Sequence, residues 1–279
     1  MEKIPFDEFG GNGRLLHFAG PNAYPPRVFK RFLGELAQEY RVTAVHHRPL
    51  WPGTKPDEMQ DWRLIAEDMI RFFDQQGMRQ AIGVGHSLGA VTTALAATLR
   101  PELFGALVLI DPVFMPPNVI EMMQANPAAA WETPLVKGAL RRRNRWPSRE
   151  AAFDHFRGKR VFGGWSDAAL RDFVAEGLTI DAETAETTLT FSREWEAQFY
   201  ANVPTWVWEM VPQLTQPTLA VRAANSDTLY PPAWALWQEK QPAATFVEVP
   251  KVGHMLTAEQ PKQVAQTVRA WRAMPQNHP

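Results

Sequence analysis

The segment "GVGHSLGA" at residues 83–90 contains Ser87, with Gly85 two residues before it and Gly89 two residues after it. An apolar, strand-like stretch precedes this segment and a helix-like run rich in alanine follows. A sharp strand-to-helix turn exposes a serine hydroxyl above a sheet, and glycines at these two positions remove β-carbons that would collide across the turn. The turn also places the serine at a helix N-terminus, where developing negative charge is stabilised. We therefore interpret Ser87 as a nucleophile rather than as a serine in a turn.

A serine nucleophile needs a histidine that accepts its proton and an acid that orients this histidine. His254, in "KVGHMLTAEQP", follows the last predicted strand, in a loop that can return to the carboxyl edge of the sheet, where open α/β sheets bind ligands. Asp227, in "VRAANSDTLYPP", follows the preceding strand and is the predicted acid, in the chain order Ser, Asp, His. Asp111, at the tip of the strand "LVLID", is the alternative acid.

The oxyanion formed by attack on a carbonyl needs two N–H donors. Leu88 provides one by its position directly after the nucleophile. The second is expected from the loop in "HFAGPNAYPP", where Pro21 has no N–H to donate. Asn22 is the predicted donor and Ala19 is the alternative.

Outside these residues, short apolar runs alternate with helix-like segments, which is the pattern of an α/β protein. Strands are predicted at 14–19, 41–47, 80–85, 105–111, 217–224 and 244–250, and helices at 27–40, 61–77, 87–99, 232–240 and 261–274. The strands are almost continuously apolar, which indicates a mostly parallel, doubly wound sheet buried on both faces. Residues 112–216 are rich in Trp, Met and charge and show no convincing strand, so we predict a helical cap inserted into a core of residues 1–111 and 217–279.

The composition narrows the classes of partner. The formal net charge of −1 favours neither nucleic acid nor an anionic membrane as a partner, and a small neutral ligand is more consistent with it. The chain contains no cysteine, which excludes disulfides, thiolate metal sites and a cysteine nucleophile. The N-terminal "MEKIPFDEFGGNG" lacks the apolar region of a signal peptide, and no apolar run approaches the ~18 residues that span a bilayer. We expect a soluble cytoplasmic protein without stable membrane insertion, and secretion stays an open alternative.

Taken together, "GHSLG", "LIDP", "SD" after a strand and "GHMLTAEQP" before the last helix resemble the α/β-hydrolase fold family over nearly the whole chain. Within that family, "LLHFAGPNAY", "RPLWPG" and "GHSLGA" are similar to a branch of bacterial serine esterases and lipases. The resemblance implies a nucleophile elbow at Ser87, a triad completed by Asp227 and His254, and hydrolysis of carboxylic esters through an acyl-enzyme. It also implies that no cofactor is needed.

Other chemistries on this fold stay open, namely carbon–carbon bond hydrolysis, thioester or peptide hydrolysis, and cofactor-free oxygenation with His254 as base and Asp111 as its partner. A non-enzymatic receptor would have lost a triad member. The cap favours a small hydrophobic ester, because some of its large apolar residues are expected to face Ser87. These residues are Met115, Met122, Met123, Trp131, Trp146, Trp165, Trp195, Trp206 and Trp208. The basic run "RRRNR" at 141–145 is interpreted as a solvated helix face, and the physiological substrate and oligomeric state stay undetermined.

Overall fold

The computed structural model describes residues 3–274 and contains a central sheet of seven strands in the spatial order β1-β3-β2-β4-β5-β9-β10. The strands are β1 (Phe6–Gly10), β2 (Leu15–Ala19), β3 (Arg41–Val45), β4 (Ala81–His86), β5 (Phe104–Ile110), β9 (Thr218–Ala223) and β10 (Thr245–Val249). Every neighbouring pair is parallel except β1 with β3. The predicted mostly parallel α/β fold is therefore confirmed. The antiparallel edge strand β1 was not predicted, because its charged residues and its Gly10 hide the apolar pattern of a buried strand.

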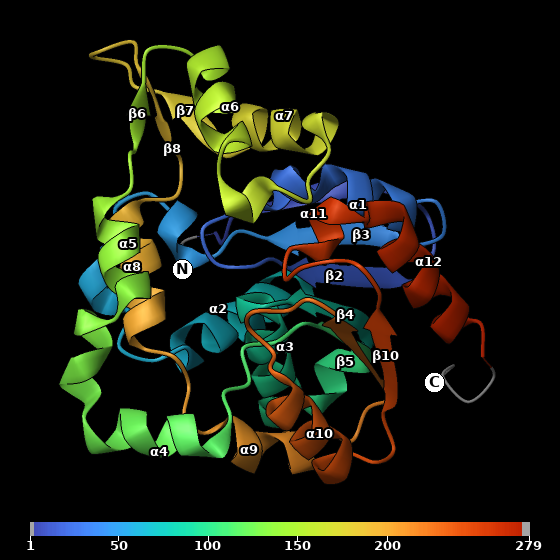
Figure 1. Cartoon of the computed structure of the whole chain (residues 1–279). Helices are drawn as coiled ribbons and strands as arrows, with labels where there is room; N and C mark the ends of the chain where they lie inside the picture. Colours follow the sequence, from blue (N-terminus) through green and yellow to red (C-terminus); the bar gives the residue numbers. More distant parts are fainter. Residues whose placement is uncertain (1–2, 275–279) are drawn as a thin grey trace.

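Helices cover both faces of this sheet (Figure 1). They are α1 (Lys30–Leu36), α2 (Arg63–Gln76), α3 (Leu88–Leu99), α10 (Pro231–Lys240), α11 (Leu256–Glu259) and α12 (Pro261–Arg272). Helices α2, α3 and α10 pack on one face together with Leu107 and Leu109 of β5, while α1, α11 and α12 pack on the other with Val108 and Ile110. Successive residues of one strand thus enter opposite cores, which explains why the sequence of β5 is apolar without alternation.

Between β5 and β9 the chain forms the cap, which runs along the top, the left and the bottom of Figure 1. Its helices are α4 (Pro117–Ala125), α5 (Pro134–Arg141), α6 (Arg149–Arg157), α7 (Asp167–Glu176), α8 (Arg193–Ala201) and α9 (Val207–Met210). The cap also contains an antiparallel sheet of β6 (Arg145–Trp146), β8 (Thr187–Leu189) and β7 (Leu178–Ile180). The prediction of a cap without strands was wrong, because strands of two or three residues are too short to show a period in the sequence.

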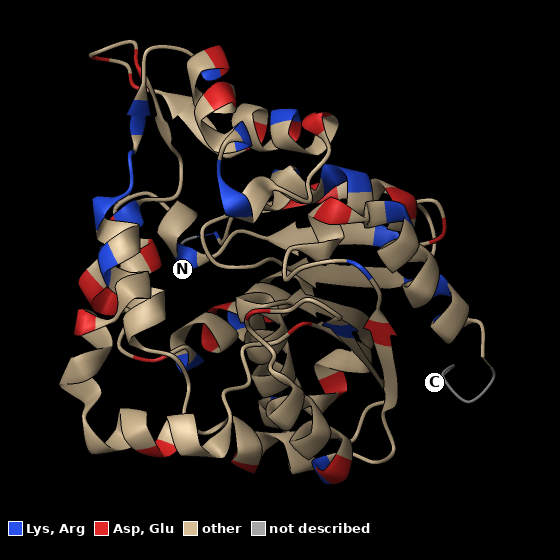
Figure 2. Ribbon diagram, in the orientation of Figure 1, with Lys and Arg blue, Asp and Glu red and all other residues tan. Residues whose placement is uncertain are grey.

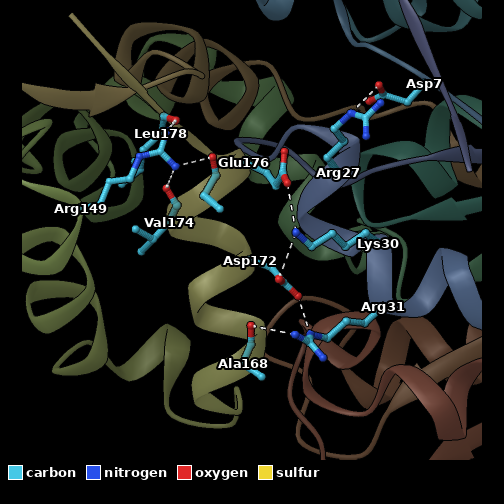
Figure 3. Close-up of polar contacts among 11 residues, drawn as sticks. Asp7, Arg27, Lys30, Arg31, Arg149, Ala168, Asp172, Val174, Glu176 and Leu178 are labelled. Atoms are coloured by element: carbon cyan, nitrogen blue, oxygen red, sulfur yellow. Dashed lines mark hydrogen bonds and ion pairs between the residues drawn. The ribbon is translucent and has the colours of Figure 1, made fainter.

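Ion pairs fasten one part of the cap to the core (Figure 3). Helix α7 presents Asp172, which is buried and forms ion pairs with Lys30 and Arg31 of α1. The Lys30 ammonium also lies 3.1 Å from Glu176 Oε1. At the end of α7, Arg149 donates to backbone carbonyls that include Ala175 O at 2.8 Å. The ion pairs with Lys30 and Arg31 hold α7 over α1 and so fix that side of the cap to the core.

Within residues 3–274, no helix is both long and apolar enough to cross a membrane.

Candidate active site

Ser87 occupies a strained turn between β4 and α3. Its backbone has φ 57° and ψ −116°, in the positive-φ region that side chains other than glycine rarely adopt. A β-carbon on Gly85 would lie 2.3 Å from Gly89 O, and one on Gly89 would lie 2.0 Å from Ala19 O. Both distances are far below a van der Waals contact, so the turn requires glycine at both positions. The two glycines that frame Ser87 in the sequence are therefore explained by the close approach of α3 to β4 and to the end of β2.

His254 reaches Ser87 from the other end of the chain. It lies in the loop between β10 and α11, and its Nε2 is 2.9 Å from Ser87 Oγ. The expected contact between these two side chains is present. At this distance the neutral imidazole can accept the serine proton directly, without a bridging water.

The acid that contacts His254 is Asp111, and the prediction of Asp227 for this contact was wrong. Asp111 Oδ2 accepts a hydrogen bond from His254 Nδ1 at 2.7 Å. The Asp227 side chain is 60% exposed, and its Oδ2 lies 3.6 Å from Nη2 of Arg160. In the loop after β9 it is Ser226, one residue earlier, that points inward, and its Oγ donates to Asp111 Oδ2 at 2.5 Å. The turn after β9 thus directs Asp227 away from His254, and Asp227 lines the cavity that Ser87 and His254 border.

The surroundings of Asp111 suit a carboxylate that accepts and does not donate. The side chain is completely buried, and its second oxygen, Oδ1, accepts a hydrogen bond from Ala223 N at 2.9 Å. Ser226 Oγ accepts bonds from the backbone N–H groups of Thr228 and Leu229, so its own proton is directed to Asp111. Three donors therefore surround the buried carboxylate. The Asp111 backbone has φ 43°, a left-handed conformation that turns the side chain toward the β9 end.

His86, directly before the nucleophile, joins the elbow to the histidine loop. Its Nε2 lies 2.8 Å from the His254 carbonyl oxygen and its Nδ1 lies 2.9 Å from Thr257 Oγ1. A carbonyl can only accept, so Nε2 carries the proton and Nδ1 accepts the Thr257 hydroxyl proton. Complete burial lowers the pKa of His86 to about 3, which keeps the ring neutral. These two hydrogen bonds show that His86 positions the His254 backbone.

The two residues predicted to donate to the oxyanion come from different elements, Leu88 from α3 and Asn22 from the loop after β2. Leu88 is the first residue of α3, and the N–H groups in the first turn of a helix have no acceptor within the helix. Asn22 lines the same cavity as Ser87, and its side-chain Nδ2 donates to Glu196 O at 3.3 Å. The carbonyl of Gly20 accepts from Gly89 N at 3.1 Å, which holds the loop after β2 against the elbow. The roles of Leu88 and Asn22 as oxyanion donors stay predictions.

Comparison with known proteins identifies the family of this chain. A family model described as "Alpha/beta hydrolase family" matches residues 12–267. The chain belongs to the alpha/beta hydrolase family. This hydrolase is 33% identical to "Bifunctional epoxide hydrolase 2" of Sus scrofa over 94 residues, which are 32% of this chain and only 17% of the length of the porcine protein.

Two solved structures show the same fold as this hydrolase. "E-2-(Acetamidomethylene)succinate Hydrolase" has a TM-score of 0.80 and 21% identity, with 97% of this chain and 95% of the other covered. An esterase of M. tuberculosis has a TM-score of 0.74 and 18% identity, with 97% of this chain and 89% of the other covered. At these identities the similarity establishes the fold alone.

Ser87 and His254 border a cavity of about 920 Å³ between the core and the cap. This volume falls in the upper part of the range that accommodates small-molecule ligands. Much of the lining is apolar, and it includes Val113, Met115, Val119, Leu135, Phe162 and Val203. The hydrolase can therefore enclose a ligand with a sizeable apolar part next to the Ser87 hydroxyl.

Most of the large cap residues singled out from the sequence do not line this cavity. Of that set, Met115 is a lining residue. Trp146, Trp165 and Trp195 are buried in the hydrophobic cores, and Met122 is 70% exposed. Aromatic lining comes instead from Tyr24 and Trp62 of the core, together with Phe162, Phe173 and Tyr200 of the cap and Tyr230. Composition could identify an apolar cap but could not show which of its side chains face the serine.

The basic run at 141–145 is solvated at Arg141, Arg143 and Arg145, as predicted, but it does not form a helix face. Helix α5 ends at Arg141, and the run continues into β6, as the blue segment between these elements shows in Figure 2. Arg142 turns toward the cavity, which it lines, and its Nη2 lies 2.9 Å from Glu196 Oε2. Arg143 stacks on Trp146. The run is therefore divided between a cavity residue and the small sheet of the cap.

Proposed function

We propose that this hydrolase cleaves carboxylic esters of small hydrophobic substrates, with Ser87 as nucleophile, His254 as general base and Asp111 as the acid that orients it. One observation carries the proposal, namely the continuous hydrogen bonding from Asp111 through His254 to Ser87 at the wall of the cavity. The esterase among the solved structures of the same fold supports it.

In the proposed mechanism, Ser87 Oγ attacks the ester carbonyl carbon while His254 Nε2 takes the hydroxyl proton. Asp111 holds the Nδ1–H tautomer and stabilises the imidazolium that forms. The resulting oxyanion accepts hydrogen bonds from Leu88 N–H and from a donor in the Asn22 loop. Collapse breaks the bond to the alcohol oxygen, which leaves with the proton from His254. Water then loses a proton to His254 and attacks the acyl carbon. The bond from that carbon to Ser87 Oγ breaks, Ser87 recovers its proton from His254, and the carboxylic acid is released.

The cavity favours a medium-length acyl chain over an acetyl group. Each methylene that becomes fully buried contributes up to ~0.8 kcal/mol, a factor of about four in kcat/KM. We expect p-nitrophenyl octanoate to be a better substrate than p-nitrophenyl acetate. A strict preference for acetate would contradict an acyl site in this cavity.

The proposed function is tested by p-nitrophenyl ester hydrolysis and by covalent labelling with an alkyl p-nitrophenyl phosphonate. Ser87→Ala is expected to fold and to lose turnover by a factor on the order of 10⁶, since loss of a triad serine has this effect in serine proteases. It should also lose labelling. The matched control is Ser148→Ala, which removes a hydroxyl that caps α6 and should keep both activity and labelling. Hydrolysis by Ser87→Ala at the wild-type rate would refute the proposed nucleophile.

A second candidate is cofactor-free oxygenation with His254 as base, which the pairing of His254 with Asp111 also permits. The two candidates differ in what Ser87 must do. An oxygenase needs no covalent Ser87 intermediate and consumes O₂, whereas ester hydrolysis proceeds at the same rate under nitrogen. Phosphonate labelling of Ser87 together with O₂-independent ester turnover therefore decides for the hydrolase.

A further inference from the structure

Five polar side chains line one part of the cavity wall, which we call the polar subsite, and contacts to Glu196 link three of the others to it. Its members are Asn22, Tyr24, Arg142, Glu196 and Tyr200. The Glu196 carboxylate lies at its centre, 2.9 Å from Arg142 Nη2 and 3.2 Å from the Tyr200 hydroxyl, which donates to it. Asn22 Nδ2 donates to the Glu196 backbone carbonyl at 3.3 Å. The subsite thus joins the loop after β2 to α8 and to the end of α5.

Packing of the cap does not explain why these groups are here. Helices α5 and α8 already contact one another through Val136, Ala139 and Ala197, which are buried. The Glu196 side chain is only 9% exposed, and burial raises its pKa above the usual range for glutamate. Burying an ion pair commonly costs more than its attraction returns, and apolar residues of similar size are often as stabilising. A buried, charged cluster on the wall of the cavity that Ser87 borders therefore points to a ligand.

Three atoms of the polar subsite are buried without a hydrogen-bond partner among the described residues, and one of them, Glu196 Oε2, is matched by the ion pair with Arg142. The other two, the acceptor Asn22 Oδ1 and the donor Arg142 Nε, have unused hydrogen-bonding capacity. The residue that carries the first of them, Asn22, is more than nine-tenths buried. A buried polar group left unpaired destabilises the protein, so such groups in native structures are usually satisfied by water or by a ligand. The subsite can accept one hydrogen bond and donate another.

The charges of the polar subsite indicate which ligand group it takes. The positive charge of Arg142 is already matched by Glu196, so a carboxylate of the ligand would meet a second carboxylate. A cation would in turn meet Arg142. An uncharged group that both donates and accepts fits the unused capacity of Asn22 and Arg142. A hydroxyl or a carboxamide has this property, and a hydrocarbon end does not.

We propose that the preferred substrate is an ester whose acyl chain carries a hydroxyl or carboxamide a few carbons beyond the scissile carbonyl, bound in the polar subsite. This inference rests on the proposed ester hydrolysis. The apolar lining holds the chain between Ser87 and the subsite, and the subsite measures chain length and rejects a plain hydrocarbon end. An acyl end without the polar group leaves the buried donor and acceptor unpaired, which lowers its kcat/KM.

The test uses p-nitrophenyl esters of ω-hydroxy acids with four to ten carbons. Each is compared with an unsubstituted ester one carbon longer, which replaces the hydroxyl by a methyl group of similar size. At the best length we expect the hydroxy ester to have a kcat/KM about tenfold higher, as for two modest hydrogen bonds. The terminal carboxamide should also be favoured, and the terminal carboxylate should be disfavoured.

Variants assign the preference to the polar subsite. In Arg142→Met and in the nearly isosteric Glu196→Gln, the ratio of hydroxy ester to its methyl counterpart should fall to about one third of the wild-type value or less. In the control Arg143→Met, the replaced side chain lies over the Trp146 ring outside the cavity. This variant should keep the wild-type ratio of hydroxy ester to methyl counterpart. A wild-type ratio near one at every length, the best rate with the carboxylate, or a ratio unchanged in both variants would overturn the inference. If the proposed function itself failed, none of the esters would be hydrolysed, which is a different result.

Discussion

Replacing Asp111 by asparagine should separate the two aspartates that the sequence offers as partners of His254. Three groups donate to the buried Asp111 carboxylate, namely Ala223 N–H, the Ser226 hydroxyl and His254 Nδ1–H. An amide of the same shape has only one acceptor oxygen, and its NH₂ must face one of these donors. No orientation of the introduced amide therefore satisfies the site.

Each orientation of the amide has a measurable consequence. If the NH₂ faces His254, the imidazole takes the other tautomer, its Nε2–H points at Ser87 and it cannot accept the serine proton. If the NH₂ faces Ala223 N–H, the imidazolium loses its counter-charge and a buried donor stays unpaired, which costs ~1–3 kcal/mol of stability. The equivalent change in a serine protease lowers turnover by ~10⁴. We expect a loss of this order, about 5 kcal/mol in activation free energy.

Asp227→Asn is the matched control, because the same change occurs at an exposed carboxylate. Its ion pair with Arg160 is between side chains that are 60% and 93% exposed, and such pairs contribute ~0–1 kcal/mol. The expected loss in kcat/KM is therefore less than about fivefold.

The assay is the kcat/KM for p-nitrophenyl butyrate, corrected for the fraction of folded enzyme that binds the phosphonate. Circular dichroism and thermal unfolding verify that both variants fold. The reasoning would be refuted if Asp227→Asn were as slow as Asp111→Asn, or if Asp111→Asn kept more than a tenth of the wild-type activity.

Two further predictions concern stability. Gly89→Ala should unfold the protein or lower its melting temperature steeply, because the new β-carbon would lie 2.0 Å from Ala19 O. In the control Gly34→Ala, in α1, the new β-carbon meets no atom within 4 Å, and the variant should be more stable by up to ~1 kcal/mol. Equal melting temperatures for the two variants in a thermal scan would contradict this prediction. His86 has a folded-state pKa lowered to about 3, so the unfolded chain, with a histidine pKa of ~6.5, binds more protons below that pH and stability falls as the solution becomes more acidic. Between pH 7.5 and 5 this residue should lower the free energy of unfolding by about 2 kcal/mol. In urea denaturation, the free energy of unfolding of His86→Gln should therefore fall by about 2 kcal/mol less than that of the wild type over the same interval. Identical pH dependences of the two proteins would show that His86 is not buried as a neutral ring.

The sequence by itself determined the features that depend on local geometry. The nucleophile turn could be predicted because glycine is required at Gly85 and Gly89 by close contacts within a few residues of Ser87 and with the end of the adjacent strand. The parallel sheet followed from strands that are apolar on both faces. His254 was identifiable because a loop after the last strand must pass the carboxyl edge of the sheet.

The tertiary structure alone decided which side chains meet across elements that are distant in the sequence. Asp111 and Asp227 both follow strands that end at the same edge, and the sequence pattern does not distinguish them. The left-handed backbone of Asp111 and the inward turn of Ser226 determine which carboxylate faces His254. Arg142 likewise belongs to a run whose sequence predicts a solvated surface, but in the structure Glu196 of α8 pairs with it. Such pairings depend on the direction of single side chains at the ends of elements, and that direction is determined by packing between distant segments rather than by the local sequence.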